Sequence, residues 1–467
     1  MKIPRQISLK KATTIILISV LLTVIGSYYA FAATPTSTFT ISPGIYPGAP
    51  SYTIWKEGNT YFAKNSNGKI EFSGTNASQV IQAALDALPN GGKIHISQGD
   101  YYLSSPIWIK YDGIVLTGES VGSDSGYGTI LRASTSLNDF IFKIQSTDGS
   151  ILQRITIRDL FIHGGRSSSY TNDGILINKT MEIHMENVII QGFIGYGMAL
   201  YQVWQGVFVD VRIYSCGDAS TEKPMLLIHY GTTDNSNELD FIGCRIGICY
   251  YDAVHIIGSP DNGDTTWNRQ ISFVGGILYH SAGESDYRCF MINYSRYIYF
   301  TDVMLGGKNN LIANSRMIFF TTCRFETGTL SSDEYLVILH GDATGNTQGI
   351  LFNGVGFWTN DEGNAIKFSG VAYGVRDVHA KGCYIYKPSF AVEPYTGLEH
   401  YWKENSVSNG DWVAHGLIWK PNIVLLTPTE ETFVWVMGWN ATHIQIGVNG
   451  TATPDVYIYA ACTEYSG

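Results

Sequence analysis

Hydrophobic and polar residues recur along the middle of this chain in a pattern seven positions long. The first position is usually large and apolar, the third is Asp, Asn, Gly or Thr, and the fourth and sixth are mostly apolar. The 223 residues between positions 157 and 380 hold eight steps, a mean near 28. The segments that share the pattern are YDGIVLT (111–117), IRDLFIH (157–163), MENVIIQ (185–191), FVDVRIY (208–214), FIGCRIG (241–247), FVGGILY (273–279), FTDVMLG (300–306), FTTCRFE (320–326), FNGVGFW (352–358) and AKGCYIY (380–386).

The repeat predicts a parallel β-helix. Its third position predicts a bend, because Gly, Asn and Asp tolerate positive φ or bond to nearby backbone. The fourth and sixth positions then begin a new strand and point inward, and a further short strand such as GILI (174–177) follows in most repeats. A leucine-rich repeat would show a fixed Leu and Asn consensus, and a propeller blade needs ~40 residues. We therefore expect one solenoid over 157–386, with an inner line made of Val188, Val211, Cys244, Val303, Cys323, Val355 and Cys383.

The flanking segments predict a cap and a second domain. Residues 51–92 hold alternating strands, typical of a small β-meander, and then an amphipathic helix over 76–88. We expect this helix to cover the first coil, since an open solenoid end exposes apolar surface. The β-helix itself is expected over 93–400. Residues 405–467 alternate in short runs split by turns, which predicts a small C-terminal β-sandwich.

The N-terminal residues have the pattern of a targeting segment. Positively charged residues precede an apolar stretch from Ala12 to Gly26, and Ala30-Phe31-Ala32 resembles a cleavage site. We expect residues 1–33 to be a signal peptide, or else an uncleaved membrane anchor, followed by a Pro/Thr/Ser-rich linker over 34–50. Either alternative predicts a secreted or cell-surface protein, and only the anchor predicts contact with a membrane.

The amino-acid composition restricts the classes of ligand that the chain is expected to bind. Charged residues make up 15 % of the chain, and the formal net charge is −10, which disfavours nucleic acid as a ligand. The seven cysteines include no closely spaced pair typical of a metal or redox motif. Cys244, Cys323 and Cys383 share the inward fourth position on non-neighbouring repeats, so we expect small core residues rather than metal ligands.

The segment 74–120 resembles the start of pectate-lyase-like β-helix proteins, a superfamily of pectate lyases, polygalacturonases, epimerase-like proteins and phage tailspikes. The resemblance lies in Ile81-Gln82-Ala83-Ala84 on the helix, Gly91-Gly92-Lys93-Ile94-His95-Ile96 in the next strand, and Gly99-Asp100-Tyr101. With the repeats it covers roughly residues 74–390. It implies an all-β, right-handed, single-stranded parallel β-helix, and the tail resembles the small sandwiches that end viral and surface fibres.

The galacturonase motifs of that superfamily are largely missing. Asn172-Asp173-Gly174 resembles the first of them, but Gly195-Tyr196-Gly197 stands where paired aspartates are expected. No Asp-Asp and no Arg-x-x-Pro-x-x-Arg motif occurs in the chain. Because the fold hosts many activities, function has to be argued from a site.

Four residues are candidates for catalysis: Asp173, Glu222, Asp252 and His255. The three acids, with Lys223 as an alternative to Glu222, are expected to precede the same strand on coils one, three and four of a series. Glu222 and Asp252 would then lie one coil apart and Asp173 and Glu222 two coils, or ~10 Å. Carboxylates ~5 Å apart suit a retaining glycosidase and those ~6.5–9.5 Å apart an inverting one. Alternatively, the aspartates are turn residues and His255 is an exposed bystander.

Aromatic and basic residues are candidates for binding a sugar chain, and these are Trp204, Trp267, Tyr196, Tyr251 and Arg166. The rings would stack on sugars, and Arg166, in a cluster with His163 and Arg158, would hold a carboxylate. Their alternatives are aromatic rings that merely cover apolar backbone and arginines that are solvated. Asp261 and Asp264 leave a Ca²⁺ site open, although two carboxylates supply few of its ligands.

Two functions remain open at this point. The first is a polysaccharide lyase or glycoside hydrolase that acts on an extracellular polysaccharide. The second is a non-catalytic surface or fibre protein, an adhesin or a structural rod, that uses the same fold to contact a cell-surface glycan. A homotrimer, which is common among tailspikes, is compatible with both.

Overall fold

The computed structural model describes the protein from residue 50 to residue 386 with short gaps, and six further strands between residues 400 and 461. The gaps are 123–126, 167–170, 233, 261–265, 280–286, 329, 332–333, 343–344, 360–363, 371–373 and 382. The predicted signal peptide and nearly all of the predicted linker lie outside the described residues. No helix among the described residues is long and apolar enough to cross a membrane.

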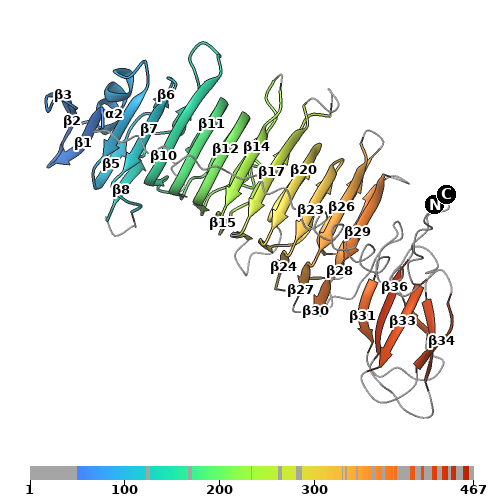
Figure 1. The fold of residues 1–467 in the computed structure, drawn as a ribbon. Helices are drawn as coiled ribbons and strands as arrows, with labels where there is room; N and C mark the ends of the chain where they lie inside the picture. The colour runs from blue at the N-terminus through green and yellow to red at the C-terminus, as the bar shows by residue number, and fades with distance from the viewer. Residues whose placement is uncertain are drawn as a thin grey trace, which may run out of the picture. The chain divides into compact units, whose positions relative to one another are not determined.

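The chain coils into three parallel sheets whose strands stack side by side (Figure 1). Sheet one contains β6 (Ile107–Ile109), β9 (Phe140–Ile144), β13 (Leu226–His229), β16 (Val254–Ile257), β19 (Phe290–Asn293), β22 (Asn310–Ala313), β25 (Tyr335–Gly341) and β28 (Asn364–Gly370). Sheet two contains β4 (Gly92–Ile96), β7 (Ile114–Gly118), β14 (Asn237–Ile242), β17 (Asn268–Val274), β20 (Ser295–Thr301), β23 (Arg316–Thr321), β26 (Thr347–Asn353) and β29 (Val375–Lys381). Sheet three contains β5 (Gly99–Leu103), β8 (Thr129–Ala133), β15 (Arg245–Gly247), β18 (Ile277–Tyr279), β21 (Met304–Gly306), β24 (Arg324–Glu326), β27 (Gly356–Trp358) and β30 (Tyr384–Tyr386).

Three long strands join these sheets. β10 (Leu152–His163) contributes to sheets two and three, whereas β11 (Asp173–Gln191) and β12 (Met198–Tyr214) each contribute to all three. Every strand in the coils pairs in parallel with its counterpart in the next coil, as β14 does with β17 and β17 with β20. The predicted right-handed parallel β-helix is confirmed.

The bend predicted at the third repeat position is present in every described repeat. Asp159, Asp210 and Asp302 have φ of 59°, 48° and 55°, and Gly243 has φ of 63°. A second bend with positive φ, which was not predicted, lies three residues before each of the nine repeats from residue 157 onward. Its members are Arg154, Glu182, Gln205, Glu238, Gln270, Tyr297, Met317, Gly349 and Asp377.

The interior is a column of stacked side chains. The phenylalanines at the first repeat position stack face to face along the axis, with ring centroids between 4.6 and 5.1 Å apart and planes within 9°. They are Phe208, Phe241, Phe273, Phe300, Phe320 and Phe352. The predicted inner line is also buried, except that Cys383 is only half-buried. Burial raises the pKa of the Cys244 thiol to about 12, as expected of an inert core cysteine.

Buried polar side chains satisfy the backbone where sheet one turns into sheet two. The Ser236 N–H donates to Asn268 Oδ1 at 2.9 Å, and the Ser295 N–H donates to Ser315 Oγ at 3.1 Å. The Val203 N–H donates to Ser236 Oγ at 3.1 Å. These side chains replace ladder bonds that the turning backbone cannot make.

The N-terminal elements lie at the first coil. Strands β1 (Tyr52–Glu57), β2 (Thr60–Asn65) and β3 (Ile70–Gly74) form an antiparallel meander, and β1 also pairs in parallel with β4. Helix α2 (Ala77–Asp86) is capped by Asn76, whose side chain accepts the Gln79 N–H at 3.3 Å. Its buried face contacts β2, β3, β5 and β6.

The C-terminal part contains two antiparallel sheets of three strands each. One is formed by β31 (His400–Glu404), β33 (Ile423–Pro428) and β36 (Val456–Ala461). The other is formed by β32 (Trp412–Ala414), β34 (Val434–Trp439) and β35 (His443–Val448). These strands are compatible with the predicted sandwich, which stays a prediction.

Candidate functional site

The candidate site lies at the edge where the chain leaves sheet three and enters sheet one. Asp173 begins the sheet-one part of β11, and Asp252 precedes β16 by two residues. Both carboxylates are buried, although most solenoid surface is solvated. A buried carboxylate needs hydrogen bonds or a cation, so its partners indicate what it does.

Asp173 is held by the next two coils. Its Oδ1 accepts the Tyr196 N–H at 2.7 Å, and Lys223 Nζ lies 3.0 and 2.9 Å from its two oxygens. Burial raises the pKa of the Asp173 carboxyl above its usual value, and the Lys223 ammonium opposes that rise. A Cβ on Gly195 would come within 1.8 Å of Asp173 Oδ1, so glycine is needed there for this approach.

Aromatic rings surround this ion pair. The Tyr196 ring stacks on Phe140 with centroids 6.3 Å apart, and Lys223 Nζ lies 5.1 Å from the Tyr196 centroid. Tyr201 lies on β12, which begins two residues after Tyr196, and its ring packs against His229 at 5.3 Å. Burial raises the pKa of Tyr201 and lowers the pKa of His229, which favours their neutral forms.

The second carboxylate forms a pair with the predicted histidine. Asp252 Oδ2 lies 2.8 Å from His255 Nε2, and Asp252 Oδ1 accepts the Arg288 N–H at 2.8 Å. Their side chains are only 3 % and 5 % exposed. The Tyr251 ring packs edge-on against the His255 ring at 5.7 Å. His255 therefore points out of the sheet, as alternation predicts, but it is covered rather than exposed.

Asp173 and Asp252 lie on the predicted coils, but no third carboxylate stands in register between them. Ile175 pairs with Met198, Met198 with Leu226, and Leu226 with Val254. Asp173 and Asp252, each two residues before its strand partner, are thus three coils apart, roughly 14 Å.

Glu222 was predicted to stand in register with Asp252 on the preceding coil, but Pro224 occupies that position. Glu222 is exposed on a turn with φ of 54°, in the hairpin closed by Asp218 and Lys223. Glu222 thus lies on the predicted coil, next to that of Asp252, but its predicted position in register with Asp252 is wrong, because the hairpin places it two residues before that position. Lys223, its alternative, pairs with Asp173.

The predicted binding residues fall in different places. Tyr196 and Tyr251 lie at the candidate site, where burial and the charges of Asp252 and Glu222 raise the pKa of Tyr251. Trp204 lies at the start of sheet two, across sheet one from the two aspartates, and pairs with Asn237. Trp267 is only 5 % exposed and packs against Tyr294.

Arg166 holds the loops of the candidate site together. Its Nη1 donates to Phe193 O at 2.7 Å and to Gly217 O at 3.1 Å, and its Cζ lies 3.5 Å from the centre of the Tyr250 ring. Arg158, in contrast, lies in sheet two and pairs with Asp159. The predicted basic cluster of these two arginines is therefore wrong, and Arg166 bridges backbone from separate coils.

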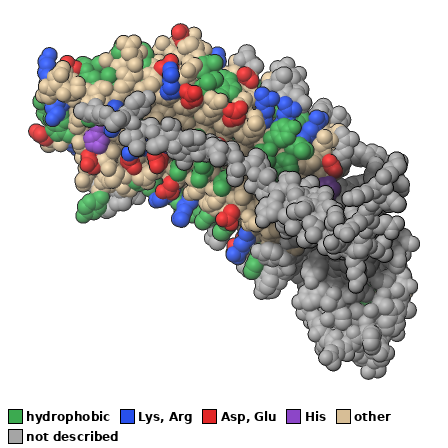
Figure 2. All heavy atoms as spheres, viewed as in Figure 1, with side chains coloured by type: hydrophobic (Ala, Val, Ile, Leu, Met, Phe, Trp, Pro, Cys, Tyr) green, Lys and Arg blue, Asp and Glu red, His purple; other side chains and the backbone are tan. Residues whose placement is uncertain are grey.

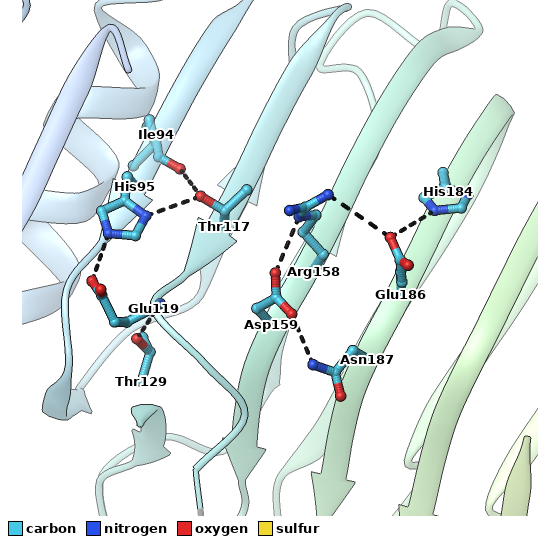
Figure 3. Close-up of polar contacts among 10 residues, drawn as sticks. All are labelled: Ile94, His95, Thr117, Glu119, Thr129, Arg158, Asp159, His184, Glu186 and Asn187. Atoms are coloured by element: carbon cyan, nitrogen blue, oxygen red, sulfur yellow. Dashed lines mark hydrogen bonds and ion pairs between the residues drawn. The ribbon is translucent and has the colours of Figure 1, made fainter. Parts of the chain in front are cut away.

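A second polar group, which the sequence analysis missed as a group, lies on the outer face of sheet two (Figure 3). His95 is 2.9 Å from Glu119 Oε2 and 3.2 Å from Thr117 Oγ1. Farther along the same face, Glu186 lies 3.5 Å from His184 and 3.9 Å from Arg158. These side chains are partly solvated, and such surface pairs contribute only about 0–1 kcal/mol each. Strand pairing alone brings them together, so a seven-position repeat carried no signal of their grouping.

Metal binding finds no support in the described residues, since no group of three or more His, Cys, Asp or Glu side chains converges there. Asp261 and Asp264, the candidates for Ca²⁺, lie outside the described residues.

The chain matches no protein-family model. Over 221 residues it is 23 % identical to "Depolymerase 1, capsule KN3-specific" of Klebsiella phage KN3-1, covering 44 % of this chain and 28 % of that protein. The matched stretch is thus less than a third of the relative's length.

Solved structures with a similar backbone fold include ORF18 of Geobacillus virus E2, with a TM-score of 0.49 and 14 % identity. The match covers 81 % of this chain and 74 % of that one. Another is an endo-xylogalacturonan hydrolase from Aspergillus tubingensis, with a TM-score of 0.46, 15 % identity and coverage of 74 % and 95 %. No inference about activity follows from these likenesses.

Proposed function

We propose that this chain binds an extended extracellular polysaccharide and cleaves it, with Asp252 and His255 as the acid–base pair. The observation that carries the proposal is their 2.8 Å contact beside several tyrosines on a rigid stack of coils. Buried titratable groups that contact a specific charged partner gather at functional sites more often than elsewhere. The similarity to a capsule-specific depolymerase supports a polysaccharide as the substrate class.

In this proposal each group has a separate role. Asp252 holds His255 by Nε2, which leaves Nδ1 as the nitrogen that accepts a proton. Arg288 fixes the other Asp252 oxygen through its N–H. His255 would then take a proton either from a sugar carbon, in a lyase, or from water, in a hydrolase. A two-carboxylate hydrolysis between Asp173 and Asp252 is disfavoured, because roughly 14 Å exceeds the span of either glycosidase geometry.

The test is turnover on a panel of capsular and plant polysaccharides, followed by reducing ends and by absorbance of unsaturated uronates. His255→Gln should lower turnover by roughly 100-fold or more, the usual contribution of a general base, while polysaccharide binding persists. His340→Gln is the matched control, since His340 lies in the same sheet and bonds only to Ser369 among the side chains described around it. Full activity of a folded His255→Gln protein would refute the assignment.

A non-catalytic binder is the second candidate, and the low exposure of Asp252 and His255 favours it. In this alternative the pair, which is 3 % and 5 % exposed, stabilises the loops and meets no substrate. This alternative predicts binding with no product from any polysaccharide, and a His255→Gln protein that differs only in its melting temperature. The same panel therefore separates the two functions.

A further inference from the structure

A column of arginines follows the edge where sheet one turns into sheet two, on the far side of sheet one from Asp252. Arg269 pairs with Arg296, and Arg296 pairs with Arg316, so the three occupy one position on successive coils. From the N-terminal to the C-terminal coil, the residues at this position are Trp204, Asn237, Arg269, Arg296, Arg316, Gln348 and Arg376. The residues of this column whose side chains are described are half-buried.

Charges of one sign at this spacing call for an explanation. Neighbouring coils are ~4.8 Å apart, and at that distance like charges repel. The chain as a whole is acidic, with a net charge of −10, so a basic column runs against its average. Arg269 forms no ion pair with any residue that the structure describes. An anionic ligand that reaches Arg269 would offset the repulsion there.

Aromatic rings orient the guanidinium groups. Arg316 Cζ lies 5.0 Å from the centre of the Trp267 ring, and Arg296 Cζ lies 5.8 Å from the Tyr297 ring. A ring within about 6 Å attracts a guanidinium through its π face, and the N–H groups of the guanidinium can still bind a planar anion. Trp267, predicted to stack on a sugar, instead lies against an arginine.

Exposed hydrophobic side chains border the column on the sheet-two side. Tyr297 and Met317 are each 38 % exposed, and the rings of Tyr299 and Phe319 stack at 5.1 Å. Figure 2 shows Lys and Arg side chains beside a hydrophobic patch on this face, towards the C-terminal half of the β-helix. Flat apolar faces beside cations suit a sugar chain that carries acidic groups, because pyranose rings present both an apolar face and polar edges.

We propose that the column Arg269–Arg296–Arg316 binds a linear anionic glycan whose chain runs along the axis of the β-helix. The coil spacing is close to the length of one pyranose unit, so an acid group on every sugar or every second sugar meets an arginine. Arginine suits this task because its fork accepts a carboxylate through two hydrogen bonds. The inference rests on the proposed polysaccharide-binding function and names the substrate class for it.

The test measures binding of oligosaccharides by calorimetry at low and high salt. Alginate carries a carboxylate on every sugar, hyaluronan on every second sugar, and carboxyl-reduced hyaluronan and dextran serve as neutral probes. Arg296→Gln with Arg316→Gln should weaken binding of an acidic probe at least about 10-fold and reduce its salt dependence. The Arg→Lys pair should fall between, since lysine lacks the fork. The control pair is Arg158→Gln with Arg245→Gln, which removes two exposed arginines from other positions.

Each other outcome has a distinct meaning. Equal binding by wild type and the Arg296→Gln/Arg316→Gln protein overturns the column as a site. Neutral probes that bind as tightly as acidic ones overturn the acidic substrate class and leave the proposed function standing, whereas no binding to any polysaccharide overturns both. If the double variant changes the sedimenting mass of the chain but not its glycan affinity, the column is a contact between copies and the inference fails.

Discussion

Truncation of Phe300 tests the stacked core most directly. Phe300 is fully buried, and its ring stacks on Phe273 at 5.1 Å and on Phe320 at 4.9 Å. Burying one such side chain stabilises a fold by about 1.5–3 kcal/mol, and each aromatic pair adds about 0.5–1.5 kcal/mol. Phe300 makes a third such pair with Phe290 at 5.4 Å. With all three pairs lost, Phe300→Ala should lower the free energy of unfolding by roughly 3–5 kcal/mol, the range usual for such truncations.

The neighbouring Tyr299 provides the matched control. Its side chain lies on the outer face of the same strand, is 37 % exposed, and stacks on one ring only. Tyr299→Ala should therefore cost about 1 kcal/mol. Urea unfolding followed by far-UV circular dichroism gives both values. Equal losses for the two variants would refute the idea that the inward ladder, rather than aromatic content, stabilises the coils.

Two further predictions concern charge and backbone. In Lys223→Met the Asp173 carboxyl loses its cation, so its already raised pKa should rise further. A pKa that is raised in the folded state makes stability fall as pH rises from the unfolded value of 3.8 towards the folded value, so thermal melts should show the variant losing more stability than wild type between acid and neutral pH. An equal loss in the two proteins would contradict the pairing. Asp302 has φ of 55°, so Asp302→Val should destabilise by about 1–2 kcal/mol in urea unfolding and Asp302→Gly by far less, whereas equal losses would show that the bend tolerates any side chain.

The fold was predictable because the residue types at the repeat positions indicate its bends and its inward-facing side chains. The third repeat position selects Asp, Asn or Gly for a left-handed backbone, and Asp210 and Gly243 both have the expected positive φ. The second bend escaped prediction because its residues, such as Gln270 and Met317, are not types that favour this conformation. The tertiary structure imposes the bend on them, and periodicity of hydrophobic residues does not record it.

The candidate site was only partly predictable, because strands fix some of its residues and loops fix the others. His255 lies in β16 and Asp252 only three residues before it, so their proximity follows from the local sequence. Glu222 was misplaced because the hairpin from Asp218 to Lys223 adds residues that no periodic pattern counts. Likewise, the cover over His255 comes from Tyr251, whose position depends on the loop rather than on alternation.

The bend between sheets two and three has a consequence for how this chain can diverge. Two residues separate β14 from β15, and the same interval recurs between β17 and β18 and between β20 and β21. An insertion there would break the alignment of every inward side chain beyond it. The turn between sheets two and three is therefore constant in length, whereas the loops at the other two edges can vary in length and sequence. A whole coil, counted from one such turn to the next, can be duplicated or deleted without changing its neighbours. The number of coils sets the length of the rod and the loops set the ligand, so the two can evolve independently.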